Sequence, residues 1–285
     1  MAEGFFGRRS QGRGEMAFVD HLEELRWHII RSLIAILFFA VLIFIKIQWV
    51  FDNIIAGPIN PNFISYRAIC ALSHTLNLGD NLCLPPVTIS MQTTTFGGQF
   101  FGSFSIASIG GLLAAFPYIF WEFWRFVKPA LKPKELKGTR FIIFWISFFF
   151  FLGAAFGYFV LGPFTFNFLA TFQVSALKMV QTKPTINDYI DNLTNLILGC
   201  GIAYEMPVLT YALTKIGLIT PQMLRRSRKY AIVIILVVAA IITPSPDWYS
   251  QTIVFIPLYS LFELGVYLSA RVYKKEKQKE MEEWS

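Results

Sequence analysis

Two carboxylates lie inside long apolar segments of this chain, where an acid needs a chemical reason to be present. Glu205 stands twelve residues into one segment and is followed closely by Pro207, and Glu263 lies in the middle of another. An ionised carboxylate in hydrocarbon is costly unless it is solvated, paired or protonated. Because Pro207 favours a kink that frees a backbone carbonyl, we expect Glu205 to face a polar groove or, protonated, to bond a neighbouring helix. Glu263 has three candidate partners by depth, namely Gln251, Tyr259 and Glu205.

Glu24 lies in a segment that leads into the first apolar run. Apolar residues recur there at spacings of three and four, which predicts an amphipathic helix at the membrane interface. Asp20 and Glu23 resemble a capping box, so the helix is expected to begin at Asp20. By itself, Glu24 forms an i,i+4 pair with His28 that is worth a few tenths of a kcal/mol.

Other charged residues have ordinary structural explanations. Glu135 balances neighbouring lysines in a basic connection, and Glu122 is expected to pair with Arg125 three positions on. The histidines share neither a helix face nor a cluster with cysteines, so no metal site is predicted. No phosphate-binding loop or nucleophile–base arrangement occurs in the sequence, and no cofactor is expected.

The composition indicates a membrane protein. Of the 285 residues, 55% are apolar and 15% are charged, and the mean hydropathy is +0.52. Soluble domains usually carry about 25% charged residues. A soluble enzyme, a disordered tail protein and a nucleic-acid binder with a hydrated basic face are therefore excluded. The start of the chain lacks the features of a cleaved signal peptide and is expected to be a retained cytoplasmic arm.

Six apolar segments predict an all-α polytopic fold with six transmembrane helices, the last two of them short. They span residues 32–45, 103–121, 141–162, 193–214, 230–243 and 252–270. The third is expected to stop near Gly162-Pro163, because proline halts a helix. Three regions follow: a cytoplasmic arm with the interfacial helix (1–28), a transmembrane domain (29–270) with an extracytoplasmic cap (51–102), and a charged cytoplasmic tail (271–285).

The basic residues predict the orientation. Of the 25 Lys and Arg residues, 21 lie in the N-terminal arm, the 2–3 connection, the 4–5 connection and the C-terminal tail, with their flanks. Cytoplasmic connections carry this excess, so both termini are expected in the cytoplasm. The net charge of +7 therefore reflects one membrane face.

Residues of the outside connections have structural interpretations. Cys70 and Cys83 share the first outside loop, and a disulfide between them would close a loop of about 14 residues, worth roughly 3 kcal/mol in the chain-entropy model. Asp188 is placed to cap the fourth helix, and Asp247, which follows two prolines, to cap the sixth. Cys200, inside the fourth segment, is expected to pack rather than react.

Several motifs occur in order along residues 16–270. They are HLEELR (21–26), GP (57–58, with Pro58), FWRFVKPALKPKE (123–135), YEMP (204–207), TPSPDWYSQ (243–251) and IPLYSLFELGVY (256–267). Together they resemble the TatC family of twin-arginine translocase proteins. The resemblance implies a receptor of the bacterial cytoplasmic (inner) membrane that binds twin-arginine signal peptides of folded precursors, with export driven by the proton-motive force and no enzymatic activity.

The resemblance also implies the site. The two signal-binding carboxylates fall on Glu24 and Glu135, with Arg26 and Phe126 beside them, and adjacent arginines are well matched by planar acidic acceptors. Single-span TatA- and TatB-type proteins are the implied partners in a hetero-oligomer, and they pack on grooves near Glu205 and the last two helices. The alternative from a different class is a proton-coupled transporter of a small solute that uses Glu205 and Glu263.

Overall fold

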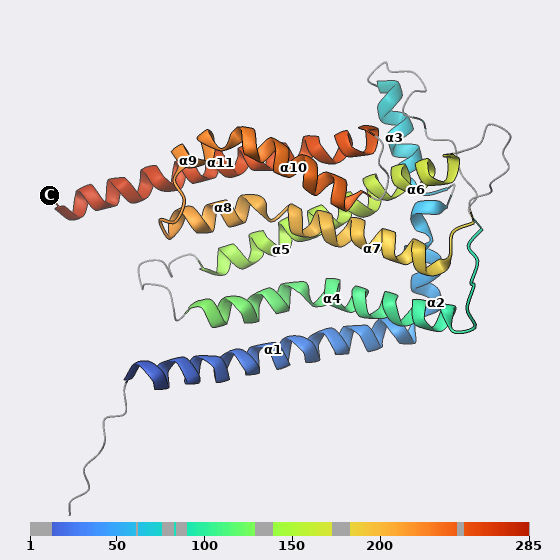
Figure 1. The fold of residues 1–285 in the computed structure, drawn as a ribbon, viewed down its shortest axis with the longest axis horizontal. Helices are drawn as coiled ribbons and strands as arrows, with labels where there is room; N and C mark the ends of the chain where they lie inside the picture. The colour runs from blue at the N-terminus through green and yellow to red at the C-terminus, as the bar shows by residue number, and fades with distance from the viewer. Residues whose placement is uncertain are drawn as a thin grey trace, which may run out of the picture.

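The computed structural model describes residues 13–60, 62–75, 83, 90–128, 139–172, 183–243 and 248–284, and this part of the chain is helical apart from short connections. Long helices lie side by side, with α1 at one side of the layer and α10 and α11 at the other (Figure 1). The longer helices are α1 (Arg13–Ile45), α4 (Gly98–Val127), α5 (Thr139–Phe156), α7 (Ile186–Ala203), α8 (Met206–Lys215), α10 (Arg228–Ile242) and α11 (Trp248–Trp284). α1 packs on α4, α5 on α7, and α11 on α8 and α10.

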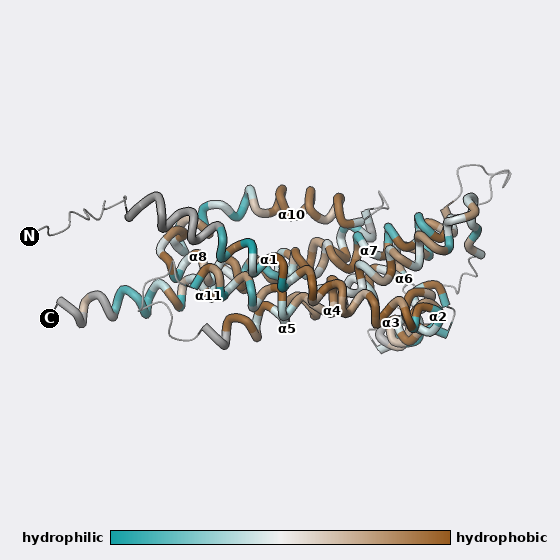
Figure 2. The backbone as a smooth tube through the Cα atoms, turned by 90° about the horizontal axis from the view of Figure 1, so that it is seen from below, coloured by the Kyte–Doolittle hydropathy of each residue, from teal (hydrophilic) through white to brown (hydrophobic). Residues whose placement is uncertain are grey.

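Five segments are long and apolar enough to cross a membrane. They are Glu23–Ile45, Gly98–Val127, Ile142–Thr171, Ile186–Lys215 and Ser250–Gln278. Large apolar side chains remain exposed along them, as at Leu37 on α1, because lipid rather than water surrounds such a surface. Figure 2 shows long hydrophobic stretches along α4, α5 and α10 and a hydrophilic C-terminal part of α11. The fold is an all-α, multi-span membrane fold.

The third segment continues past the point where it was expected to stop. The turn η4 (Gly157–Leu161) is π-helical and leads directly into α6 (Gly162–Thr171). Pro163 lies in the first turn of α6, where its missing N–H costs little. A Cβ at Gly157 would lie 2.5 Å from the Leu196 carbonyl oxygen, so glycine lets the turn approach α7 closely.

The fourth segment is broken in its middle. α7 ends at Ala203 and α8 begins at Met206, with Pro207 buried in the first turn of α8. The predicted kink at Pro207 is therefore confirmed. At the start of α7, Thr185 is the N-cap and Asp188 completes a capping box with it, so Asp188 contributes from the third helical position rather than as the cap itself.

The ends of the chain differ from their predicted boundaries. α1 begins at Arg13, so Asp20 lies inside the helix and is not its N-cap. α10 is short, with 15 residues, as predicted. α11 has 37 residues and continues to Trp284, so the prediction of a short sixth helix was wrong, and the charged stretch after residue 270 continues the same helix. The tail is rich in Lys and Glu, which favour helix and lengthen it past its apolar part.

Three tyrosines hold the beginning of the cap, where the chain leaves regular helix. η1 (Phe51–Ile55) is π-helical and η2 (Gly57–Ile59) is a 3-10 turn, with Pro58 buried. Tyr158 and Tyr189 donate to the carbonyls of Ile54 and Ile55 at 2.5 and 2.6 Å. Tyr66 of α3 (Ile64–Thr75) donates to the Pro58 carbonyl at 2.8 Å. Backbone groups that have lost their helical partners are satisfied in this way.

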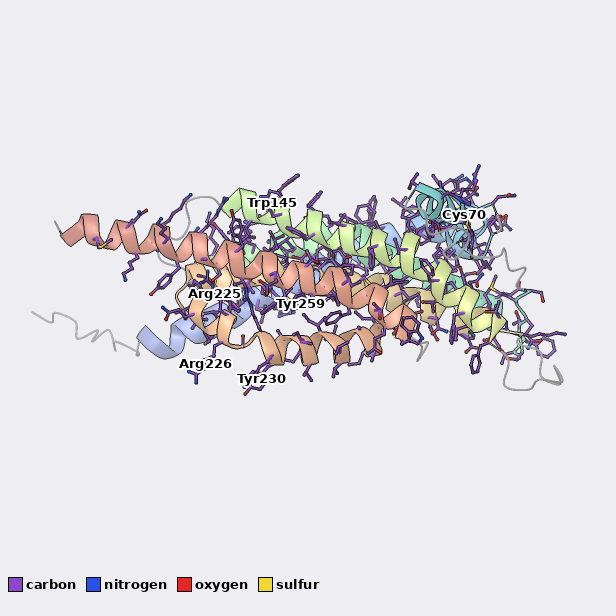
Figure 3. The ribbon with its side chains drawn as sticks, turned by 90° about the horizontal axis from the view of Figure 1, so that it is seen from above. Cys70, Trp145, Arg225, Arg226, Tyr230 and Tyr259 are labelled. Carbon is purple, nitrogen blue, oxygen red and sulfur yellow. A yellow bond between two sulfur atoms is a disulfide. The ribbon has the colours of Figure 1, made fainter. Side chains whose placement is uncertain are left out.

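Opposite ends of the bundle carry different features. The start of α1, the short helix α9 (Pro221–Arg226) and the C-terminal end of α11 lie at one end, and α2 (Ile47–Val50) and α3 lie at the other (Figure 1). The two basic residues of α9, Arg225 and Arg226, lie at the first end (Figure 3).

Candidate functional site

Glu24 lies on α1 at the end of the bundle that also holds α9. Its side chain is 51% exposed, and its Oε1 lies 3.9 Å from His28 Nε2, so the expected i,i+4 pair is present. Arg26 is exposed on the same helix. Phe126, near the end of α4, packs edge-on against His28 with ring centroids 6.1 Å apart. Glu24 and Phe126 are thus near one another through His28, whereas Glu135 lies outside the described residues.

A buried cluster connects α1 to α4 beneath Glu24. The Glu122 carboxylate is 1% exposed, forms a hydrogen bond with His28 Nδ1 and accepts one from the Tyr118 hydroxyl at 3.0 Å. Arg31 Nη1 lies 3.8 Å from the same carboxylate. Hydrogen bonds and a neighbouring cation therefore compensate this buried acid, as a carboxylate without water requires.

The predicted pair between Glu122 and Arg125 was wrong. Glu122 faces α1, while the Arg125 guanidinium lies over the Trp121 ring at 5.8 Å from its centroid. An acid three residues before a basic residue favours a local pair, but packing against a second helix supplies stronger partners. In the sequence, His28 was the one indication of this partner, since it is a polar residue on a helix that runs into an apolar segment. Its contact with α4 could not be inferred from spacing.

Glu205 lies at the break between α7 and α8. Its two carboxylate oxygens are buried, and no side chain of the described part of the chain forms a hydrogen bond with them. The neighbouring Thr210 hydroxyl bonds backbone carbonyls of α8 instead. Glu205 is therefore a half-buried acid with buried carboxylate oxygens at an irregular point of a spanning segment, where such residues commonly have a function.

Glu263 has a partner that the sequence did not suggest. Arg228, at the start of α10, reaches Glu263 Oε2 at 2.7 Å, and Tyr259 donates to Oε1 at 3.3 Å. Of the three candidate partners, Tyr259 is confirmed. Gln251 donates to the Leu236 carbonyl at 3.2 Å and ties α11 to α10 elsewhere. Figure 3 shows Tyr259 at the side of α11 that faces α10, with Arg225, Arg226 and Tyr230 towards the end of the bundle.

Cys70 and Cys83 form a disulfide, with their Cα atoms 4.4 Å apart. Cys70 lies in the cap region, far from Arg225 (Figure 3). His74 Nε2 is 3.7 and 3.9 Å from the two sulfurs, so the expectation that no histidine clusters with cysteines was wrong. His74 follows Cys70 by one turn of α3, which brings it to the bridge. Sulfurs joined in a disulfide offer a metal no thiolate. Cys200 is buried, as expected, and Asp247 lies outside the described residues.

Comparison with known proteins now defines the family. The family model described as Sec-independent protein translocase protein (TatC) matches residues 20–257. This chain belongs to the TatC family. It is therefore a membrane subunit of Sec-independent protein translocation and not an enzyme, and the match decides for protein transport over the alternative of a solute transporter.

Individual TatC proteins match over nearly their whole length. The TatC of Blattabacterium sp. is 38% identical over 268 residues, which cover 93% of this chain and 98% of that protein. The TatC of Aquifex aeolicus is 32% identical over 263 residues, covering 92% and 98%. A crystal structure of a TatC described as the twin-arginine translocase receptor superposes with a TM-score of 0.65 at 31% identity, covering 88% of this chain and 99% of that one.

Proposed function

We propose that this TatC-family chain is the receptor that binds twin-arginine signal peptides of folded precursors and nucleates the export complex. The matching crystal structure is that of a twin-arginine translocase receptor. The two arginines of a signal bind Glu24 and Glu135, with Arg26 and Phe126 at the edges of the site. Arg–carboxylate pairs are bidentate and charge-assisted, which suits recognition of adjacent guanidinium groups.

The position of Glu24 supports this proposal most directly. Its carboxylate is half exposed, so a ligand can reach it, and its helix is anchored to α4 directly beneath it through His28 and Glu122. A binding group held on a rigid element loses little freedom when its ligand arrives. Phe126 packs against the His28 ring, where it offers an apolar surface to residues that flank the arginines.

Peptide binding to the purified protein in lipid nanodiscs tests the proposal. A fluorescent signal peptide with two arginines should bind, and the same peptide with two lysines should bind more weakly. Glu24→Gln and Glu135→Gln should each weaken binding of the arginine peptide. Glu23→Gln is the matched control, because Glu23 is an exposed acid one position from Glu24. Unchanged binding in the Glu24→Gln/Glu135→Gln double variant would contradict the proposal.

Single-span TatA- and TatB-type proteins are the proposed partners. The exposed apolar face of α10 and the half-buried acid Glu205 support two packing areas. Val237 and Ile241 of α10 are 53 and 76% exposed, and a short helix with such a surface is well suited to pack against another membrane helix. Cysteines at these two positions should crosslink to a partner protein in membranes, and a lipid-facing role alone predicts no specific crosslink.

The orientation is proposed to be N-in and C-in, in the bacterial cytoplasmic membrane, with α10 and α11 forming the fifth and sixth crossings. α10 is about 22 Å long at 1.5 Å per residue, against roughly 30 Å of hydrocarbon. A locally thinned bilayer accommodates the difference. Labelling of single cysteines with a membrane-impermeant reagent in intact cells and in inverted vesicles tests this arrangement at Ser227 and Thr252.

A further inference from the structure

The buried cluster beneath Glu24 contains a histidine that lies between two carboxylates, with one ring nitrogen nearest to each. His28 is 5% exposed; its Nε2 lies 3.9 Å from the exposed Glu24, and its Nδ1 bonds the buried Glu122. One imidazole therefore bridges the acid expected to receive a signal arginine and an acid that never meets solvent.

We infer that His28 is a positioning residue of the signal-peptide site and that it sets how much of the Glu24 charge is available to an incoming arginine. This inference rests on the proposed function above. It concerns a residue outside the pair of acids that make the proposed contacts with the signal.

The buried acid determines which nitrogen of His28 exchanges its proton. Glu122 is surrounded by donors, since it accepts from Tyr118 and His28 and lies near Arg31, and a buried carboxylate in such a setting is an acceptor. Nδ1 of His28 is therefore the donor in both protonation states. The hydrogen bond at one ring nitrogen fixes the tautomer, so the proton that comes and goes is carried by Nε2, which faces Glu24.

The local charge balance gives the direction of the effect. The described titratable groups that face His28 are Glu24 and Arg31 on α1 and Glu122 and Tyr118 on α4. With His28 protonated, two cations balance two carboxylates. With His28 neutral, one negative charge remains, and it lies on the exposed Glu24. A cationic signal is thus bound more tightly when His28 is neutral, that is, as the pH rises.

The exposure of Glu24 determines how strongly the charge of His28 changes peptide binding. Glu24 is half exposed, so the imidazolium acts on it as a partner in a surface ion pair rather than a buried one. Such pairs are worth about 0.2–1 kcal/mol, which corresponds to a change in the dissociation constant of up to about fivefold.

The dissociation constant of the twin-arginine peptide is to be measured in nanodiscs from pH 5.5 to 8.5 at fixed ionic strength. The unmodified protein should bind about two- to fivefold more tightly at pH 8 than at pH 5.5. His28→Gln/Glu122→Gln keeps a hydrogen bond between two amides in the buried position, and its binding should not depend on pH. His28→Arg carries a permanent charge, so its binding should be flat at the weaker, low-pH level. His74→Asn should retain the pH dependence of the unmodified protein.

The same pH dependence in His28→Gln/Glu122→Gln as in the unmodified protein would overturn the inference, and so would tighter binding at low pH. Failure of the proposed function has a different signature, because Glu24→Gln and the lysine peptide would then leave binding unchanged at every pH. A purely structural role for His28 predicts altered folding yield in its variants but no selective loss of the pH dependence.

Discussion

Replacing Glu122 with alanine tests how strongly the buried cluster fastens α1 to α4. The change leaves His28 Nδ1 and the Tyr118 hydroxyl without their acceptor in a site that is 1% exposed. Two hydrogen bonds to a charged group are worth about 1.5–3 kcal/mol each, and removal of one partner of a buried ion pair costs about 3–5 kcal/mol. We expect the free energy of unfolding to fall by about 3–5 kcal/mol, and by less in Glu122→Gln, which retains an acceptor oxygen.

Unfolding of the purified protein in mixed micelles by increasing SDS gives this free energy, with tryptophan fluorescence as the signal. A double-mutant cycle with His28→Ala should show a coupling of about 1.5–3 kcal/mol, because the two residues share one charge-assisted bond. The matched control is Glu263→Gln. The side chains of Glu263 and Arg228 are 33 and 47% exposed, so their ion pair is worth less than about 1 kcal/mol. Additive effects of Glu122→Ala and His28→Ala within about 0.5 kcal/mol would refute the reasoning.

Three further predictions concern the cap and the helix contacts. Replacing Cys70 and Cys83 with serine should lower the stability of the cap by about 3 kcal/mol, seen as faster protease cleavage of the first loop; equal cleavage with and without the bridge would contradict it. Burial raises the pKa of the Tyr66 phenol, whose hydroxyl bonds the Pro58 carbonyl. The stability from this burial is fully present below about pH 10 and is lost as the pH rises through the higher folded pKa, so the cap should loosen above pH 10 in the unmodified protein, and Tyr66→Phe should reduce this pH dependence. A Cβ at Gly111 would lie 2.8 Å from backbone atoms of α1. Gly111→Val should therefore lower the free energy of unfolding in the SDS assay by about 1–3 kcal/mol. An unchanged free energy of unfolding would contradict this prediction and would show that the two helices separate readily.

Much of the fold could be predicted because apolar runs and proline positions act locally. The six apolar segments all correspond to helices, and the fourth segment is kinked at Pro207, as expected of a proline inside a helix. The boundaries were less accurate, because tertiary packing decides whether a helix tolerates an unusual turn. Gly157 and Pro163 allow a π-helical turn where proline alone predicts a stop.

Partners between helices were the least predictable part of the candidate site. Glu24 and His28 lie on one helix, so their pair follows from spacing. Glu122 and Glu263 instead bond residues 94 and 35 positions away, which depends on the rotation of each helix about its axis. The local neighbour Arg125 therefore did not predict the partner of Glu122, which is determined by the packing of α1 on α4.

The most direct test of the central claim compares two adjacent acids. The dissociation constant of a twin-arginine signal peptide is measured with Glu24→Gln and with Glu23→Gln under identical conditions at pH 8. Loss of a charge-assisted bond of about 1.5–3 kcal/mol predicts at least about tenfold weaker binding for Glu24→Gln and no change for Glu23→Gln. Equal losses in the two variants, or equal binding of the lysine peptide, would contradict the assignment of Glu24 as an arginine acceptor.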